Sequence, residues 1–270
     1  MHNEFLEELG QKPIVNTFKL AYKMLLSNKF LFVVVTIIFI FLSIAQYLIP
    51  VMFLSEITEI SMVLVSIVVV GIELVLQIFT EANYLYICKM LLDSPSEEKC
   101  VDTMASTYVS ELFTDYFLRA LGSFLAMLLI VMPFIAIREE YYMGEYWDMF
   151  FMLLLLLALY VYSIVVYKIT LSKNFKEAFL ATFSLFAPSV WKQSFNMSYA
   201  KFVISLALIL YGTYYILTYA IDNISLGFDF TAISIGVMVL MTILSMFVAL
   251  FVLPVAMMIA QSISADIKDK

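Results

Sequence analysis

The sequence predicts an all-α, polytopic membrane protein with six transmembrane helices and with amphipathic helices at the cytoplasmic surface of the bilayer. Hydrophobic residues make up 64% of the 270 residues and charged residues only 14%, and the mean hydropathy is +1.00. Soluble domains average about 45–50% apolar and about 25% charged residues, so a soluble core could not bury this much apolar surface. The apolar runs are continuous and do not alternate with a period of two, which indicates helices rather than barrel strands.

Six apolar runs reach the length of about 20 residues that a helix needs to cross the hydrocarbon layer. We place the transmembrane helices at Phe30–Ile49, Ile60–Thr80, Phe117–Ile137, Met149–Tyr167, Phe202–Ile221 and Thr231–Ala260. The last run is longer than one span and contains Pro254. We therefore expect a kink at this proline or a change to an interfacial segment.

The basic residues predict that both termini are cytoplasmic, because Lys and Arg collect in cytoplasmic loops. With the six spans placed as above, Arg138 is the one member of the fifteen Lys and Arg residues that falls in an outer loop. The outer loops and their borders carry the acidic residues Glu56, Glu59, Glu139, Glu140, Glu145, Asp148, Asp222 and Asp229.

Amphipathic segments precede the first and the fifth span. One helical face of the first segment is formed by Ile14, Phe18, Ala21, Tyr22 and Leu25, and the corresponding face of the second by Phe175, Ala178, Phe179, Thr182, Phe183 and Phe186. We expect both helices to lie in the head-group plane, with lysines directed toward anionic phosphates. The residues predicted to make these contacts are Lys12, Lys19, Lys23, Lys173, Lys176 and Lys192.

The whole chain, 1–270, is expected to form a single integral membrane domain. A third, more acidic amphipathic segment, Glu97–Glu111, precedes the third span. The chain can therefore be divided into three units, 1–95, 96–170 and 171–270, each an interfacial helix followed by a two-span hairpin. Alternatively, these amphipathic helices are the ordinary loop helices of a polytopic protein.

Glu73 is the one ionisable residue placed well inside a predicted span. It shares a helical face with Ser66, Gln77, Thr80, Glu81 and Tyr84. An intramembrane carboxyl is expected to face the bundle interior and to be protonated or hydrogen-bonded. Thr36 lies at a similar depth in the first span, so we predict an intramembrane polar cluster of Glu73, Gln77 and Thr36. This cluster is either a proton or substrate site or, as we favour, a hydrogen bond that holds the helices in register.

No cofactor, metal or nucleic-acid site is expected from the sequence. His2 is the only histidine, and the spacing of Cys88 and Cys100 matches no metal or redox motif. Both cysteines fall on the predicted cytoplasmic side, where thiols remain reduced. There is no basic nucleic-acid footprint, since the net charge is −7.

Several short motifs give the chain a resemblance to a known family. They are Asn174-Phe175-Lys176-Glu177-Ala178-Phe179, the pair Trp191-Lys192, the closing stretch from Leu253-Pro254 to Ile267-Lys268, and the opening Thr17-Phe18-Lys19-Leu20-Ala21-Tyr22-Lys23. In these the chain resembles the membrane domain of bacterial glycerophosphodiester phosphodiesterases and its stand-alone inner-membrane relatives. Ser264 departs from the pattern, which often has an aromatic residue there. The resemblance implies a bacterial inner-membrane protein and transfers no catalytic residue, because no phosphodiesterase domain is present.

The sequence thus favours a non-enzymatic integral membrane protein that supports envelope or lipid homeostasis or scaffolds a protein partner in the membrane or the cytoplasm. Anionic lipids are the expected ligands of its lysines. The alternative is the transmembrane subunit of a transporter that is driven by a cytoplasmic ATPase. A cavity lined by Glu73 and Gln77 would favour transport, whereas a tightly filled bundle would favour the scaffold.

Overall fold

The computed structural model describes residues 4–53, 59–111, 115–140, 145–224 and 230–265, and within these ranges it contains helices and no strand. The long helices are α3 (Lys29–Phe53), α4 (Glu59–Asp93), α6 (Phe117–Glu140), α7 (Glu145–Thr170), α10 (Met197–Ile224) and α11 (Phe230–Phe247), which continues through the π-helical turn η4 (Val248–Val252) into α12 (Leu253–Ala265). The short ones are α1 (Glu4–Gln11), α2 (Pro13–Ser27), α5 (Glu97–Glu111), α8 (Phe175–Thr182), the 3-10 turn η2 (Phe183–Phe186) and α9 (Pro188–Ser194). The all-α prediction is confirmed, and each predicted apolar run lies in a helix.

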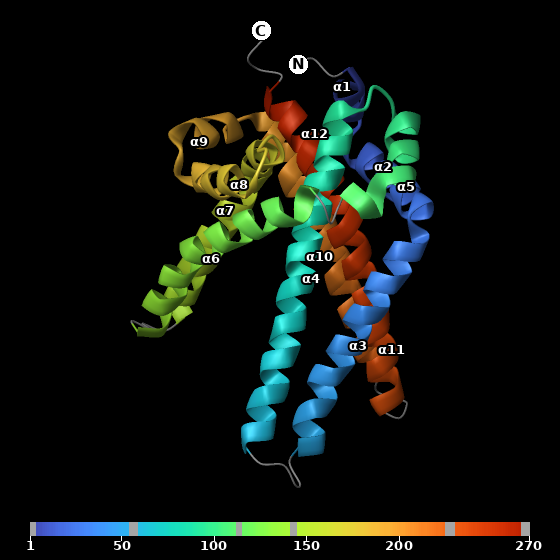
Figure 1. The fold of residues 1–270 in the computed structure, drawn as a ribbon, viewed down its shortest axis with the longest axis vertical. Coiled ribbons are helices and arrows are strands. Elements are labelled where there is room, and N and C mark those ends of the chain that lie inside the picture. Colours follow the sequence, from blue (N-terminus) through green and yellow to red (C-terminus); the bar gives the residue numbers. More distant parts are fainter. Residues whose placement is uncertain (1–3, 54–58, 112–114, 141–144, 225–229, 266–270) are drawn as a thin grey trace.

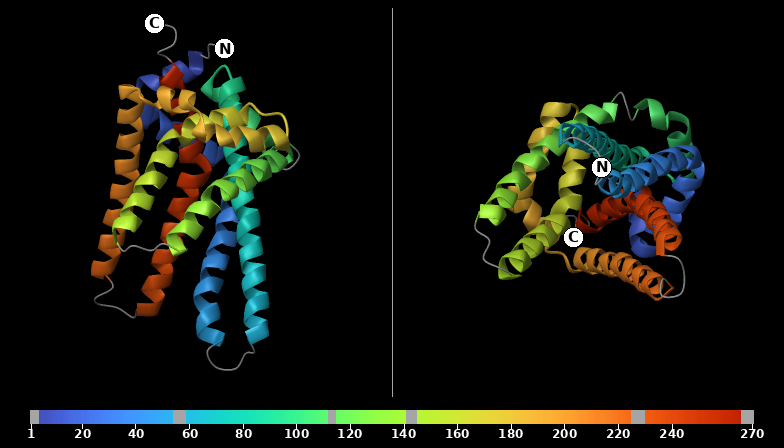
Figure 2. Two further views of the ribbon diagram at one scale, coloured as in Figure 1. Left: turned by 90° about the vertical axis from the view of Figure 1, so that its left-hand side faces the viewer. Right: turned by 90° about the horizontal axis from the view of Figure 1, so that it is seen from below.

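The short helices gather at one end of the molecule, and the long helices extend from that end toward the other (Figures 1 and 2). α1 and the C-terminal part of α12 lie together at the short-helix end, where the Ser262 hydroxyl donates to the Leu6 carbonyl at 3.4 Å. The sequence argument also used His2, Glu56, Asp229, Ile267 and Lys268, which lie outside the described residues.

Three described helical segments are long and apolar enough to cross a membrane, namely Ile67–Asp93, Met197–Leu217 and Val239–Ser264. Helix α2 together with α3 as far as Leu42 would add a fourth if this bent pair formed one span, and Phe117–Pro133 is a shorter apolar helix. Large apolar side chains stand exposed on these segments, among them Ile67, Val68, Leu208 and Ile216. Such a surface is suited to contact with lipid. These apolar helices therefore support the prediction that the chain is a membrane protein.

Helix α2 meets α3 at an angle of 92°, as expected for an interfacial helix that leads into a span. Thr17, Leu20, Ala21 and Met24 of α2 are buried, whereas Tyr22, on the apolar face that we expect to lie in the head-group plane, is 55% exposed. α2 packs against α12 and α5, so contacts within the protein account for its buried residues.

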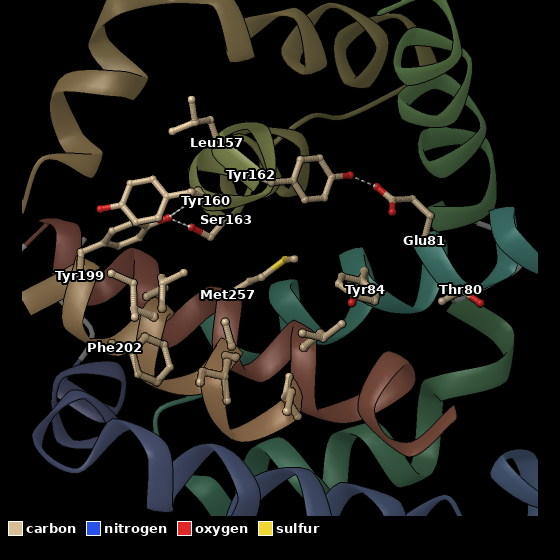
Figure 3. A pocket seen from close by; sticks show the side chains of 18 of the residues that line it. Thr80, Glu81, Tyr84, Leu157, Tyr160, Tyr162, Ser163, Tyr199, Phe202 and Met257 are labelled. Atoms are coloured by element: carbon tan, nitrogen blue, oxygen red, sulfur yellow. Dashed lines mark hydrogen bonds between the residues drawn. The ribbon is translucent and has the colours of Figure 1, made fainter. Parts of the chain in front are cut away.

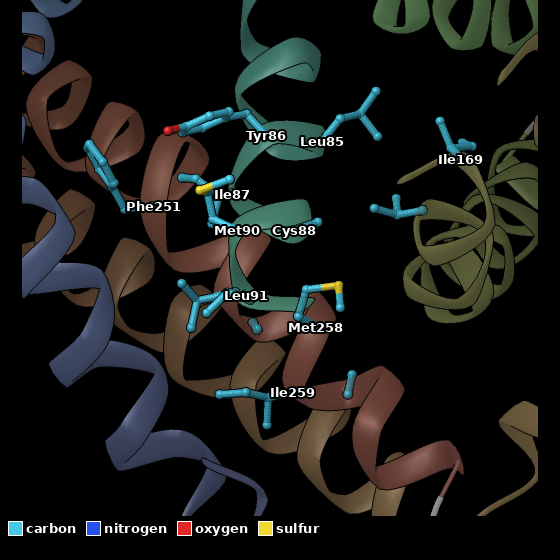
Figure 4. Packing of buried hydrophobic residues seen from close by; sticks show 14 of the residues in the cluster. Leu85, Tyr86, Ile87, Cys88, Met90, Leu91, Ile169, Phe251, Met258 and Ile259 are labelled. Carbon is cyan, nitrogen blue, oxygen red and sulfur yellow. The ribbon is translucent and has the colours of Figure 1, made fainter. Parts of the chain in front are cut away.

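Helix α4 continues well beyond Thr80, where the sequence analysis ended the second span, and it extends to Asp93. No glycine or proline interrupts the helix between Gly71 and Pro95, so the chain continues in helical form to Asp93. The added segment lies in the centre of the protein core (Figure 4), with Leu85, Ile87 and Leu91 fully buried. It packs against α12, α6 and α7.

The helix continues through Pro254, since Val239–Ser264 forms one helical segment, and the π-helical turn η4 lies just before the proline. In a regular α-helix the Leu250 carbonyl would accept from the N–H of residue 254, which proline lacks. The buried Asn83 side chain of α4 replaces that donor, since its Nδ2 donates to the Leu250 carbonyl oxygen at 2.6 Å. The tertiary contact between α4 and η4 therefore compensates for the proline.

Gly122 on α6 allows α8 to approach very closely. A Cβ atom at this position would lie 2.5 Å from the Phe175 backbone oxygen. Asn174 caps the start of α8 by accepting from the Glu177 N–H at 3.0 Å, and Glu177 Oε2 accepts in return from the Lys173 N–H at 2.8 Å. The cap fixes the start of α8 and the glycine fixes its distance from α6.

We predict that Gly122→Ala lowers the free energy of unfolding by about 1–3 kcal/mol, because the added methyl group overlaps backbone that has no room to shift. The measurement is the melting temperature in detergent. Gly71→Ala and Gly212→Ala are matched controls, since a Cβ at either position meets nothing within 4 Å. An unchanged melting temperature for Gly122→Ala would contradict the close packing of α6 on α8.

We predict that Asn83→Leu destabilises the protein by about 1–3 kcal/mol, because it leaves the buried Leu250 carbonyl without a donor. Pro254→Ala returns a backbone N–H to that carbonyl, so Asn83→Leu should cost less in the Pro254→Ala background. The four melting temperatures of this double-mutant cycle measure the coupling. Equal costs in both backgrounds would show that Asn83 does not compensate for the proline.

Candidate functional site

A cavity of about 940 Å³ lies among α4, α7, α10 and α12. Most of its lining is apolar. The described residues that line it are Phe39, Glu73, Gln77, Thr80, Glu81, Tyr84, Leu153, Leu157, Tyr160, Tyr162, Ser163, Tyr199, Phe202, Val203, Ile204, Leu206, Ala207, Leu210, Leu253, Ala256, Met257 and Ala260. Leu153 and Ile204 are more than half exposed, so the cavity is accessible from the surface.

The Glu81 carboxyl of the cavity accepts hydrogen bonds from two neighbouring helices. Its Oε1 accepts from the Tyr162 hydroxyl at 3.0 Å and from the Ser123 hydroxyl at 3.2 Å. Ser123 in turn accepts from the Thr182 hydroxyl at 3.3 Å. This Glu81 cluster joins α4, α7, α6 and α8 through side chains, and it holds the carboxyl in one orientation.

A second polar cluster lies on the other side of the cavity from Glu81, with Met257 between the two clusters (Figure 3). The Tyr199 hydroxyl donates to the Tyr160 backbone carbonyl and lies 2.6 Å from the Ser163 hydroxyl. The Tyr160 hydroxyl donates to the Ser194 carbonyl at 2.7 Å. Because the single Tyr199 proton goes to the Tyr160 carbonyl, Ser163 is the donor in its bond to Tyr199.

The structure places two of the three predicted polar residues at this site. Glu73 and Gln77 line the cavity, whereas Thr36 is not among the lining residues. The Thr36 side chain is buried, and its hydroxyl has no hydrogen-bond partner among the described residues. The predicted cluster is therefore divided, with α4 alone contributing its members to the cavity.

Glu81 is the residue that sequence reasoning missed. Ending the span at Thr80 placed Glu81 at the membrane boundary, although it shares a helical face with Glu73 and Gln77. The uninterrupted helical sequence up to Pro95 was the signal that could have placed Glu81 inside the bundle. Its partners Tyr162 and Ser123 are far away in the sequence and gave no such signal.

The predicted head-group lysines fall into two groups. Lys19 and Lys23 form ion pairs with Glu97 of α5, at 3.6 and 2.5 Å. The other four, Lys12, Lys173, Lys176 and Lys192, have exposed side chains. All lie on the short helices or directly beside them, so they are grouped at the short-helix end.

Outside the cavity, Arg119 contacts an aromatic ring and the two cysteines are buried. The Arg119 guanidinium lies over the Tyr116 ring, 4.9 Å from its centre. Burial raises the pKa of Tyr116 to about 12 although the Arg119 charge opposes the shift. Cys88 and Cys100 are free, buried thiols, and burial raises the pKa of Cys100 to about 11. No group of three or more His, Cys, Asp or Glu side chains suited to a metal ion occurs among the described residues.

No family model, curated protein or solved structure was found to match this chain. The resemblance to the phosphodiesterase-associated membrane domain therefore stays a prediction. The structure gives one of its motifs a local role, because Asn174 and Glu177 cap the start of α8. The cavity and its two polar clusters are accordingly the basis for the functional argument.

Proposed function

We propose that this chain is a non-enzymatic, six-span protein of the bacterial inner membrane that binds a lipid-like amphiphile in the cavity among α4, α7, α10 and α12 and thereby serves lipid homeostasis. The observation that carries this proposal is the combination of a mostly apolar cavity with two confined polar clusters. An acyl chain suits the apolar lining, and a polar head group suits the clusters.

Six spans are supported by the six long helical elements, α3, α4, α6, α7, α10 and α11–α12. An even number of crossings agrees with α1 and the end of α12 lying at one end of the molecule. The positive-inside rule assigns that end to the cytoplasm. Exposed lysines at the same end, such as Lys173 and Lys176, are then positioned to contact anionic head groups.

A second candidate function is that of a transporter subunit driven by a cytoplasmic ATPase. The observation in its favour is that Glu73 and Gln77 line the cavity. In that case α5 or the α8–α9 region, at the short-helix end, would contact the ATPase. The apolar lining favours a lipid-like ligand over a path for a polar solute, and we therefore place lipid binding first.

The topology predicts that reporters fused within Lys173–Lys192 report a cytoplasmic location, and that reporters in the loop between α6 and α7 report a periplasmic one. Paired fusions of alkaline phosphatase and green fluorescent protein measure this, because each is active on only one side. A periplasmic signal from Lys173–Lys192 would overturn both the orientation and the proposed head-group contacts.

Filling the cavity should reduce the amount of lipid that remains bound. Ala207 on α10 and Leu157 on α7 both line the cavity, and both side chains are exposed. Tryptophan at these two positions therefore narrows the cavity without removing core packing. We expect the Ala207→Trp/Leu157→Trp variant to retain several-fold less lipid, measured by native mass spectrometry.

Leu208→Trp is the matched control for this experiment. Leu208 neighbours Ala207, is 65% exposed and does not line the cavity. Both proteins should have melting temperatures close to that of the parent chain. Equal lipid retention by the two variants would contradict the proposed function.

A further inference from the structure

We propose that the head group of the bound amphiphile is a cation of the amine type. This inference rests on the proposed function and identifies the chemical class of the ligand. It depends on the charges that line the cavity, on the aromatic rings beside them and on the geometry of the Glu81 carboxyl.

The charges of the cavity lining have one sign. Glu73 and Glu81 are acidic, and no Lys, Arg or His is among the described lining residues. Arg119, near the start of α6, lies over the Tyr116 ring and does not line the cavity. An anionic head group beside Glu81 would be repelled by that carboxylate in a low-dielectric site, and no Lys, Arg or His among the described lining residues would offset the repulsion. A cationic head group would instead be attracted to Glu81.

Aromatic side chains form a large part of the same wall. The cavity is lined by Phe39, Tyr84, Tyr160, Tyr162, Tyr199 and Phe202. An ammonium group over the face of such a ring is stabilised by the electrons of the ring, and the interaction strengthens where water is excluded. The rings also cover methylene groups next to the head group, as a substituted amine requires.

The Glu81 carboxyl is oriented for one additional partner. Both of its hydrogen bonds, from Tyr162 and from Ser123, end on Oε1. No described residue donates to Oε2, and the side chain lines the cavity. An ammonium N–H can therefore donate to Oε2 while the protein holds the carboxyl in place, and such a charge-assisted bond is among the stronger hydrogen bonds.

The apolar residues accommodate the rest of the ligand. Leu153, Leu157, Leu206, Leu210 and Met257 line the cavity, and Leu153 and Leu157 are exposed on α7. A hydrocarbon chain can thus extend from the Glu81 cluster along α7 toward the surface. A small hydrophilic amine would leave this apolar lining uncovered, so the ligand class is an amphiphilic amine.

Photo-crosslinking with three matched probes tests the head-group class. The probes are dodecyl chains with a mid-chain diazirine and a terminal amine, alcohol or carboxylate, and each is added to the full chain in lipid nanodiscs. Peptide mass spectrometry measures labelling of the α7, α10 and α12 segments. We expect the amine probe to label these segments and the carboxylate probe to give about tenfold less labelling.

Three glutamate variants, tested with the amine probe, connect the labelling to the lining carboxylates. Glu81→Gln should reduce amine labelling by about tenfold, since it removes the charge but keeps the shape. Glu73→Gln should also reduce it, and this variant serves if Glu81→Gln fails to fold. Glu98→Gln is the control, because Glu98 is exposed on α5 and does not line the cavity; its labelling should equal that of the parent.

Each contrary outcome has a definite meaning. Equal labelling by all three probes, or stronger labelling by the carboxylate, would overturn the cationic head group while leaving an amphiphile-binding cavity. Full labelling of folded Glu81→Gln and Glu73→Gln would overturn the role of the carboxylates in the same way. Failure of every probe to label the cavity would overturn the proposed function together with this inference.

Discussion

Buried polar groups on α4 must find partners within the protein, because neither lipid nor an apolar core can hydrogen-bond to them. Asn83 and Glu81 both have such partners, but on different neighbouring helices. Asn83 donates to the carbonyl that Pro254 leaves without a donor, and Glu81 accepts from α7 and α6. Since the two residues are separated by one position on the same helix, together they fix its rotation relative to three neighbours.

The position of the cavity follows from the same arrangement. The segment of α4 from Ala82 to Leu91 packs against α12 and α7 (Figure 4). Farther from the short-helix end, Glu73 and Gln77 face open volume instead of packed side chains. Glu81 lies at the transition between the two regions. In such a bundle the close-packed helices keep their relative positions, and the adjoining cavity can hold a ligand.

The differences between expectation and structure have a common physical origin. The buried face of α2 and the π-helical turn before Pro254 both depend on neighbours that are remote in the sequence. Hydropathy records only how apolar a local segment is, so it located the long helices but not the side chains that these helices bury against one another. Likewise, depth estimates placed Thr36 level with Glu73, but relative helix rotation decides which side chains meet, and the Thr36 hydroxyl has no hydrogen-bond partner among the described residues.

The sequence by itself determined the helical class, the apolar character that suits a membrane, and the approximate positions of the long helices. These properties depend on composition and on local runs of residues, because backbone hydrogen bonds within a helix need no distant partner. Only the tertiary structure decided which carboxyl is enclosed by hydroxyl donors and which residues surround the cavity. Those features arise from contacts among α4, α6, α7, α8, α10 and α12, and no local pattern in the chain specifies how these helices pack against one another.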